Sequence, residues 1–141
     1  MSFSHTLVGV VALSAIGTMA ANLVLPPVPL IVINSLNYEN GMITQDRTIN
    51  TDADVAFMEW RAEIVDVKTG EPVPECQGQG TWNYTAGRKA IPMTLARWTG
   101  NDNCTASVLT SPEGYYPRAT YTWGENQVVG KDEVFYPDEV N

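Results

Sequence analysis

No charged side chain precedes Glu39 in this chain of 141 residues. Within that neutral stretch, residues 6–25 form one uninterrupted apolar run. A helix needs about 20 apolar residues to cross a hydrocarbon core about 30 Å thick. The sequence therefore predicts a hydrophobic helix that directs the chain to a membrane, followed by a separate domain.

The fate of this helix has two interpretations. The favoured one is a signal-anchor or transmembrane helix over residues 1–25, because the run is long for a signal peptide and lacks an N-terminal Lys or Arg. The alternative is a signal peptide cleaved after Ala20. We expect a single-pass membrane protein with its C-terminal domain on the extracytoplasmic side, or a secreted or periplasmic protein after cleavage. Residues 26–29 are a Pro-rich spacer, and residues 30–141 are the exported domain.

The two cysteines support export. Cys76 and Cys104 are the only cysteines in the chain, which is what one disulfide bond in an oxidising compartment requires. Two reduced, buried thiols in a cytosolic protein are the alternative interpretation.

The charge of the domain limits its partners. The chain has a formal net charge of −8, with 16 acidic and 8 basic residues. Nucleic acids and anionic lipid surfaces are bound by clustered Lys and Arg, and here the basic residues are scattered. The sequence therefore argues against a nucleic-acid partner.

Residues 56–64 alternate between apolar and charged side chains. The apolar set is Met58, Trp60, Ala62 and Ile64, and the charged set is Glu59, Arg61 and Glu63. This period of two predicts a strand with one face on a core and the other face in water.

Turn residues divide the rest of the domain into short strands. Asn40-Gly41 is the strongest hairpin signal, because a type I′ turn needs two residues with positive φ. Candidate strands fall near residues 30–38, 43–49, 54–66, 79–84, 92–98, 104–109, 115–123 and 128–136. Seven or eight such strands predict an all-β fold, a small antiparallel β-sandwich with an immunoglobulin-like arrangement.

Catalytic chemistry has few candidates. The only histidine, His5, precedes the hydrophobic run, so imidazole mechanisms and His-ligated metals are not expected in the domain. The carboxylates considered for a paired-acid site are Glu59, Glu63, Asp66 and Glu113. Possible calcium ligands are Asp52, Asp54 and residues 101–103, although such clusters usually form Asx-turns. We expect no catalytic residues, no metal and no cofactor.

Aromatic residues are the best binding candidates. Trp82, Tyr84 and Trp98 lie near Gly- and Asn-rich turns, and such rings offer a large contact area with a polar tip. The favoured interpretation of the aromatic residues is nevertheless that they fill a sandwich core, with Tyr121 and Trp123 against Trp60. Residues 83–85 and 103–105 match the N-glycosylation sequon. Residues 78–80 (Gly-Gln-Gly) predict the start of a strand, where the small residues allow a close approach of the backbone.

Together these features predict a non-catalytic interaction module. We expect it to be membrane-anchored or exported, and to dock onto a protein as an accessory or structural subunit of a membrane, cell-envelope or virion assembly. The alternative is a carbohydrate-binding β-sandwich that uses exposed Trp and Tyr, with a glycan as partner.

Overall fold

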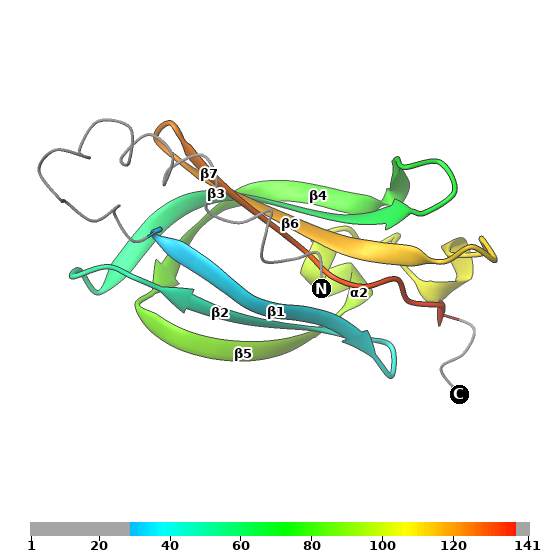
Figure 1. Cartoon of the computed structure of the whole chain (residues 1–141), viewed down its shortest axis with the longest axis horizontal. Coiled ribbons are helices and arrows are strands. Elements are labelled where there is room, and N and C mark those ends of the chain that lie inside the picture. The colour runs from blue at the N-terminus through cyan, green and yellow to red at the C-terminus, as the bar shows by residue number, and fades with distance from the viewer. Residues whose placement is uncertain (1–28, 138–141) are drawn as a thin grey trace, which may run out of the picture.

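The structure, a computed structural model, describes residues 29–137. It consists of two antiparallel sheets that face each other (Figure 1). One sheet has the order β1-β2-β5, formed by β1 (Ile31–Glu39), β2 (Met42–Ile49) and β5 (Gly87–Thr94). The other has the order β4-β3-β6-β7, formed by β4 (Pro72–Thr85), β3 (Val55–Asp66), β6 (Tyr115–Trp123) and β7 (Asn126–Lys131). The predicted small antiparallel β-sandwich is confirmed.

The predicted N-terminal helix lies outside the described residues, as does the spacer up to residue 28. Between residues 29 and 137, no helix combines the length and the apolar character that are needed to cross a bilayer.

The hairpin predicted at Asn40-Gly41 joins β1 to β2. Asn40 has φ 53° and Gly41 has φ 80°, and Glu39 pairs with Met42 directly across the turn. Both central residues therefore occupy the left-handed region that a type I′ turn requires.

The alternation predicted for β3 is confirmed on its apolar face. Met58, Ala62 and Ile64 are buried, and Trp60 is half-buried against the same core. Glu59 and Arg61 are exposed on the other face.

The expectation that Glu63 faces water is wrong. Glu63 is buried, and its Oε1 accepts a 3.0 Å hydrogen bond from Nε of Arg118 on the neighbouring strand β6. The two residues are register partners. Their charges are paired directly across the strands, which allows the carboxylate to be buried.

Three of the predicted strands have different bounds. The strand expected at residues 79–84 is the longer β4, in which Pro72 and Pro74 are tolerated because β4 is an edge strand. The strand expected at 92–98 ends at Thr94. The strand expected at 128–136 is β7, which ends at Lys131. Beyond this strand, Phe135 forms an isolated bridge to Tyr115.

The chain turns helical after Thr94. The short helix α2 (Leu95–Thr99) follows, with Thr94 as its N-cap: the Thr94 hydroxyl accepts a 3.1 Å hydrogen bond from the Arg97 N–H. The strand expected at 104–109 is also wrong, because Ala106–Val108 form one turn of 3₁₀ helix.

The sandwich is closed on one side and open on the other. On the closed side β1 packs against β7. On the opposite side lie the edge strands β4 and β5, which belong to different sheets and are not hydrogen-bonded to each other. Helix α2 contacts both strands and lies between the layers (Figure 1). This open side contains the candidate site.

Candidate functional site

A cleft of about 320 Å³ enters the sandwich between β4 and β5. Sites for small ligands occupy about 300–1,000 Å³, and aromatic walls with a few polar groups are typical of them. The volume of this cleft is at the lower end of that range.

Apolar side chains form the two walls of the cleft. On one side are Trp60 of β3 and Trp82 and Tyr84 of β4, and on the other are Ile91 and Met93 of β5. Trp82 is 63% exposed although it lies on the inward-facing side of β4, because no strand faces it directly across the open side. Among the apolar side chains that line the cleft, Trp82 is the exposed one.

Helix α2 closes one end of the cleft with Arg97 and Trp98. The structure therefore brings the three predicted binding residues, Trp82, Tyr84 and Trp98, to one cleft. It does not expose them equally: Tyr84 and Trp98 are buried, and only Trp82 offers an open ring face. Tyr121 is also buried, whereas Trp123 is half-buried against the core.

The floor of the cleft contains a buried hydrogen-bond chain. The side-chain amide of Gln45 donates from Nε2 to the Tyr121 hydroxyl at 2.6 Å, and its Oε1 accepts from Nε1 of Trp98 at 3.0 Å. Gln45 is 1% exposed. One amide side chain thereby satisfies two aromatic polar groups that come from the other sheet and from α2.

Arg47 lies beside these hydrogen-bonded side chains, and one of its guanidinium nitrogens has no hydrogen-bond partner. Its residue exposure is 9%, and its Nε is buried without a hydrogen-bond acceptor. The guanidinium carbon lies 4.9 Å from the centroid of the Tyr84 ring, which is a cation–π distance. The ion pairs of the described residues, Arg88–Asp46 and Arg118–Glu63, do not include it.

Two tyrosines of the cleft, Tyr84 and Tyr121, are held in their neutral form. Burial raises the pKa of Tyr84 and the pKa of Tyr121 above the ordinary value, because the charged phenolate would lose its hydration. Their rings meet edge to face, with centroids 5.6 Å apart. They therefore act as aromatic surface and hydrogen-bonding groups.

Reasoning from the sequence missed Gln45 and Arg47. Both lie on the same face of β2 as Ile43 and Ile49, and all four side chains are buried. The signal was present: two long polar residues share a parity with two isoleucines, which places them on the core face.

Two glycines allow the end wall to form. A Cβ at Gly78 would overlap the backbone carbonyl oxygen of Thr99, and a Cβ at Gly80 would lie 3.0 Å from the indole Nε1 of Trp60. The predicted close approach of the backbone is therefore confirmed at Gly78, whereas the neighbour at Gly80 is a side chain. The predicted strand start is wrong, because both glycines lie in the interior of β4. Helix α2 packs directly on the strand at Gly78.

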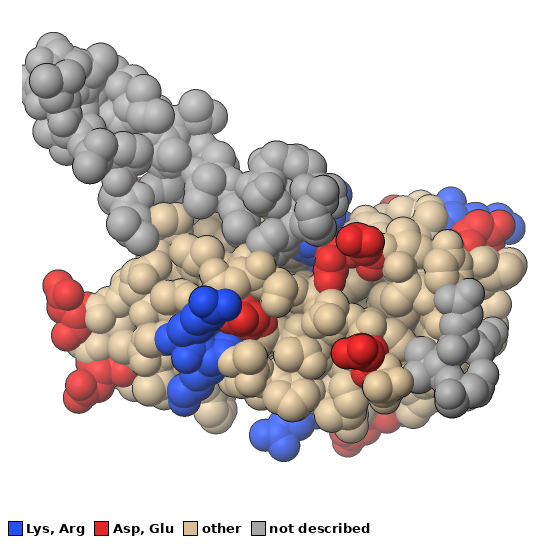
Figure 2. Space-filling view, turned by 60° about the horizontal axis from the view of Figure 1, so that its bottom comes forward, with Lys and Arg blue, Asp and Glu red and all other residues tan. Residues whose placement is uncertain are grey.

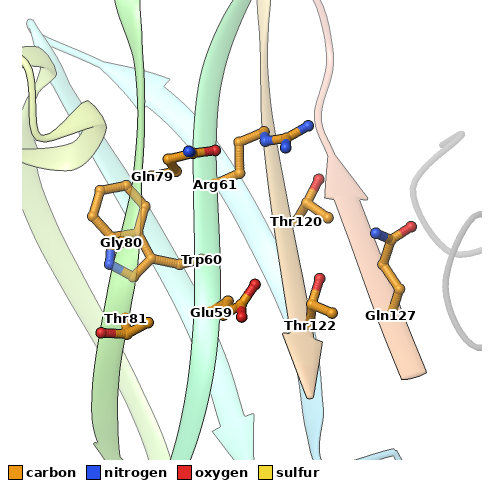
Figure 3. Close-up of a pocket in the computed structure, with 9 residues that line it drawn as sticks. All are labelled: Glu59, Trp60, Arg61, Gln79, Gly80, Thr81, Thr120, Thr122 and Gln127. Carbon is orange, nitrogen blue, oxygen red and sulfur yellow. The ribbon is translucent and has the colours of Figure 1, made fainter. Parts of the chain in front are cut away.

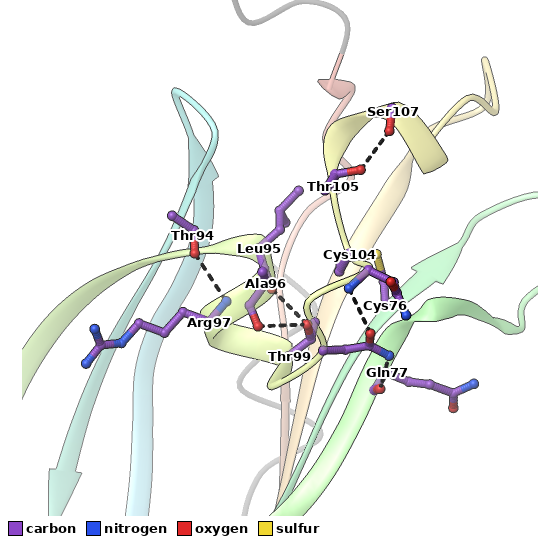
Figure 4. The surroundings of a disulfide bond; sticks show 12 residues. Cys76, Gln77, Thr94, Leu95, Ala96, Arg97, Thr99, Cys104, Thr105 and Ser107 are labelled. Atoms are coloured by element: carbon purple, nitrogen blue, oxygen red, sulfur yellow. Dashed lines mark hydrogen bonds between the residues drawn. A yellow bond between two sulfur atoms is a disulfide. The ribbon is translucent and has the colours of Figure 1, made fainter.

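The disulfide bond fastens the same wall (Figure 4). Cys76 of β4 is bonded to Cys104, which follows α2. Asn101 adds a 3.2 Å hydrogen bond from Nδ2 to the Gln77 carbonyl. The predicted disulfide is confirmed, and it joins a strand to a loop.

A second hollow lies on the outer face of the β4-β3-β6-β7 sheet (Figure 3). It also measures about 320 Å³ and is lined by polar side chains, among them Glu59, Arg61, Thr120 and Gln127. Trp60 reaches it beside Gly80, where no side chain separates the two faces of the sheet. The side chain of Arg61 lies on this outer face.

The carboxylates considered for catalysis are divided between separate places. Glu59 lies in the outer hollow, Glu63 is paired with Arg118, and Asp66 and Glu113 line an open hollow elsewhere. Asp66 accepts the Lys68 N–H at 2.8 Å, and Glu113 accepts the Ser111 hydroxyl at 3.2 Å. Both carboxylates are therefore engaged within their own turns.

One of the possible calcium ligands, Asn101, has a local role. The Asn101 side chain accepts the Asn103 N–H at 3.0 Å, which is the expected Asx-turn. Over residues 29–137, no three His, Cys, Asp or Glu side chains gather as a metal-binding group.

Charge on the visible surface is mixed. Figure 2 shows Lys and Arg in separate small groups, interspersed with Asp and Glu and with wide uncharged areas.

No protein-family model matches this chain, and neither does any curated protein.

Proposed function

We propose that this chain is a non-catalytic interaction module that holds a group of its partner in the cleft between β4 and β5. The observation that carries the proposal is the gathering of Trp60, Trp82, Tyr84, Arg47 and Arg97 around one cleft. Trp, Tyr and Arg are the residue types that dominate binding energy at protein contacts, especially where they line desolvated pockets.

The setting we propose is an exported or membrane-anchored module with an immunoglobulin-like fold. The orders β1-β2-β5 and β3-β6-β7 match the A-B-E and C-F-G neighbours of that fold, with the fourth strand beside the third. The apolar run at residues 6–25 and the disulfide support a role outside the cytosol, as an accessory subunit of a membrane, envelope or virion assembly.

Copurification of the full chain from gently solubilised native material tests this function. We expect a companion protein to copurify with the wild type and to be lost with Trp82→Ala, which removes an exposed ring without opening the core. Thr81→Ala is the matched control, because Thr81 is exposed on the opposite face of the same strand. A companion retained by Trp82→Ala, or no companion at all, contradicts the proposal.

Carbohydrate binding is the second candidate, favoured by the 63% exposure of Trp82. A flat indole at the mouth of a cleft is a stacking surface for a sugar ring. Glycan-array binding that Trp82→Ala abolishes would support it, and a blank array would exclude it.

A further inference from the structure

We propose that the cleft is specific for a small organic acid: a carboxylate carried on a flat, apolar body. The inference rests on the proposed function, in that it assumes that the cleft binds a ligand. It adds the chemical class of that ligand, which follows from the position of Arg47.

Arg47 supplies the anion-binding group. Its Nε is buried and unpartnered at the floor of the cleft, and the residue is only 9% exposed. A buried N–H without an acceptor is unfavourable, because it has lost its hydration and gained no hydrogen-bond partner. A carboxylate that enters the cleft supplies the missing acceptor, in the planar geometry that a guanidinium matches.

The remaining polar groups of the floor do not compete for this anion. Both functional ends of the Gln45 amide are already engaged, by Tyr121 and by Trp98. Among the described residues, Arg47 Nε is the buried side-chain atom that has no hydrogen-bond partner.

The charge of the cleft differs from that of the whole chain. Arg47 lies at its floor and Arg97 at its end, and none of the described residues that line it is Asp or Glu. The chain as a whole has a net charge of −8. A locally basic cleft within an acidic chain favours an anion there and disfavours a cation.

The walls define the rest of the ligand. Apolar surfaces face each other across the cleft, with Trp82 and Trp60 on one side and Ile91 and Met93 on the other. Such walls favour a flat apolar group, since each ring face that it covers is removed from water. A fully hydroxylated sugar would leave most of its hydroxyl groups without partners against these side chains.

Calorimetry with paired probes tests this inference on the full chain. The probes are benzoate, phenylacetate and indole-3-acetate, each compared with its uncharged amide of the same shape. We expect at least one acid to bind saturably and about tenfold or more tighter than its amide, the factor that one charged hydrogen bond contributes.

Arg47→Met separates the role of the charge from a role in folding. Replacing a buried, unpaired charge by an apolar side chain of similar volume leaves stability unchanged or raises it. We therefore expect the variant to unfold at the same or a higher temperature and to lose the preference for acid over amide. Arg88→Met is the matched control, because Arg88 is paired with Asp46 on the outside of the same sheet; it should keep the preference. Trp82→Ala should weaken acid and amide alike.

The possible results distinguish the two proposals. Equal binding of acid and amide, or an unchanged preference in Arg47→Met, overturns the organic-acid inference and leaves the cleft as a contact site. Absence of saturable binding by every acid also overturns it. The proposal of an interaction module fails separately, if Trp82→Ala leaves copurification of the companion intact.

Discussion

The indole Nε1 of Trp98 donates a 3.0 Å hydrogen bond to Oε1 of Gln45, although 53 positions separate the two residues in the chain. Trp98 belongs to helix α2 and Gln45 to the central strand of the three-stranded sheet. The same amide also binds Tyr121 from the opposite sheet. One side chain therefore connects both layers of the sandwich and the helix that closes the cleft.

Gln45→Leu should destabilise the fold. It removes the two hydrogen bonds that Gln45 makes with the buried Trp98 N–H and the Tyr121 hydroxyl. The loss of each hydrogen bond costs about 1–3 kcal/mol of unfolding free energy. Urea unfolding measures the change. Thr44→Ala, on the outer face of the same strand, should stay within about 0.5 kcal/mol of the wild type.

A double-mutant cycle with Tyr121→Phe sharpens this test. The two substitutions should be non-additive, because removal of the Tyr121 hydroxyl leaves one fewer unpaired group in Gln45→Leu. Strict additivity, or a wild-type midpoint for Gln45→Leu, would show that the hydrogen-bond chain contributes nothing.

Gly78→Ala should be among the most damaging single-methyl additions in the domain. The new Cβ would overlap the Thr99 carbonyl oxygen, a backbone atom that cannot rotate away. We expect a loss of about 3 kcal/mol or more, the upper end of overpacking costs. Chemical denaturation measures it, and Gln79→Ala on the exposed neighbour is the control. A fully stable Gly78→Ala would refute the close packing of α2 on β4.

Loss of the disulfide should lower stability by about 3–4 kcal/mol in the chain-entropy model, given the 28-residue separation of Cys76 and Cys104. The comparison is between the wild type and the double variant Cys76→Ala/Cys104→Ala in urea. Intact mass of the native protein provides a check, because the bonded form lacks two hydrogens. A native mass with both thiols reduced would contradict the bond.

Alkaline pH should unfold the domain through its buried tyrosines. Burial raises the pKa of Tyr84 and of Tyr121 in the folded state, so their contribution to stability is fully present below pH of about 10, the ordinary tyrosine value, and is lost as the pH rises above it. Absorbance titration should show these phenols ionising only together with unfolding. Tyr121→Phe should reduce the alkaline loss. Reversible ionisation of every tyrosine near its ordinary value, in the folded protein, would refute this burial.

The sheets could be predicted because β-strands carry a local signal. Alternation along Met58, Trp60, Ala62 and Ile64 places one face of β3 on the core. Asn40-Gly41 specifies the hairpin between β1 and β2 by backbone conformation alone. The five-residue helix α2 could not be predicted in this way, because its length gives too few turns for a helical period. Its existence depends on the Thr94 cap and on the space that Gly78 leaves.

The candidate site was predictable only in part. Aromatic content identified Trp82, Tyr84 and Trp98, but not which of them would be exposed, since that depends on which strands lie opposite. Arg47 illustrates the harder case. Its parity in β2 places it in the core, but its lack of an acceptor is a property of the neighbouring sheet and helix.

The bond between Cys76 and Cys104 connects β4 to the segment that follows α2. Strand β4 carries Trp82, and helix α2 carries Trp98. Before the thiols are oxidised, only non-covalent contacts hold the helix on the strand. The rigidity of the cleft between β4 and β5 thus depends on oxidation: a freshly synthesised chain acquires its full rigidity there only after the disulfide bond forms.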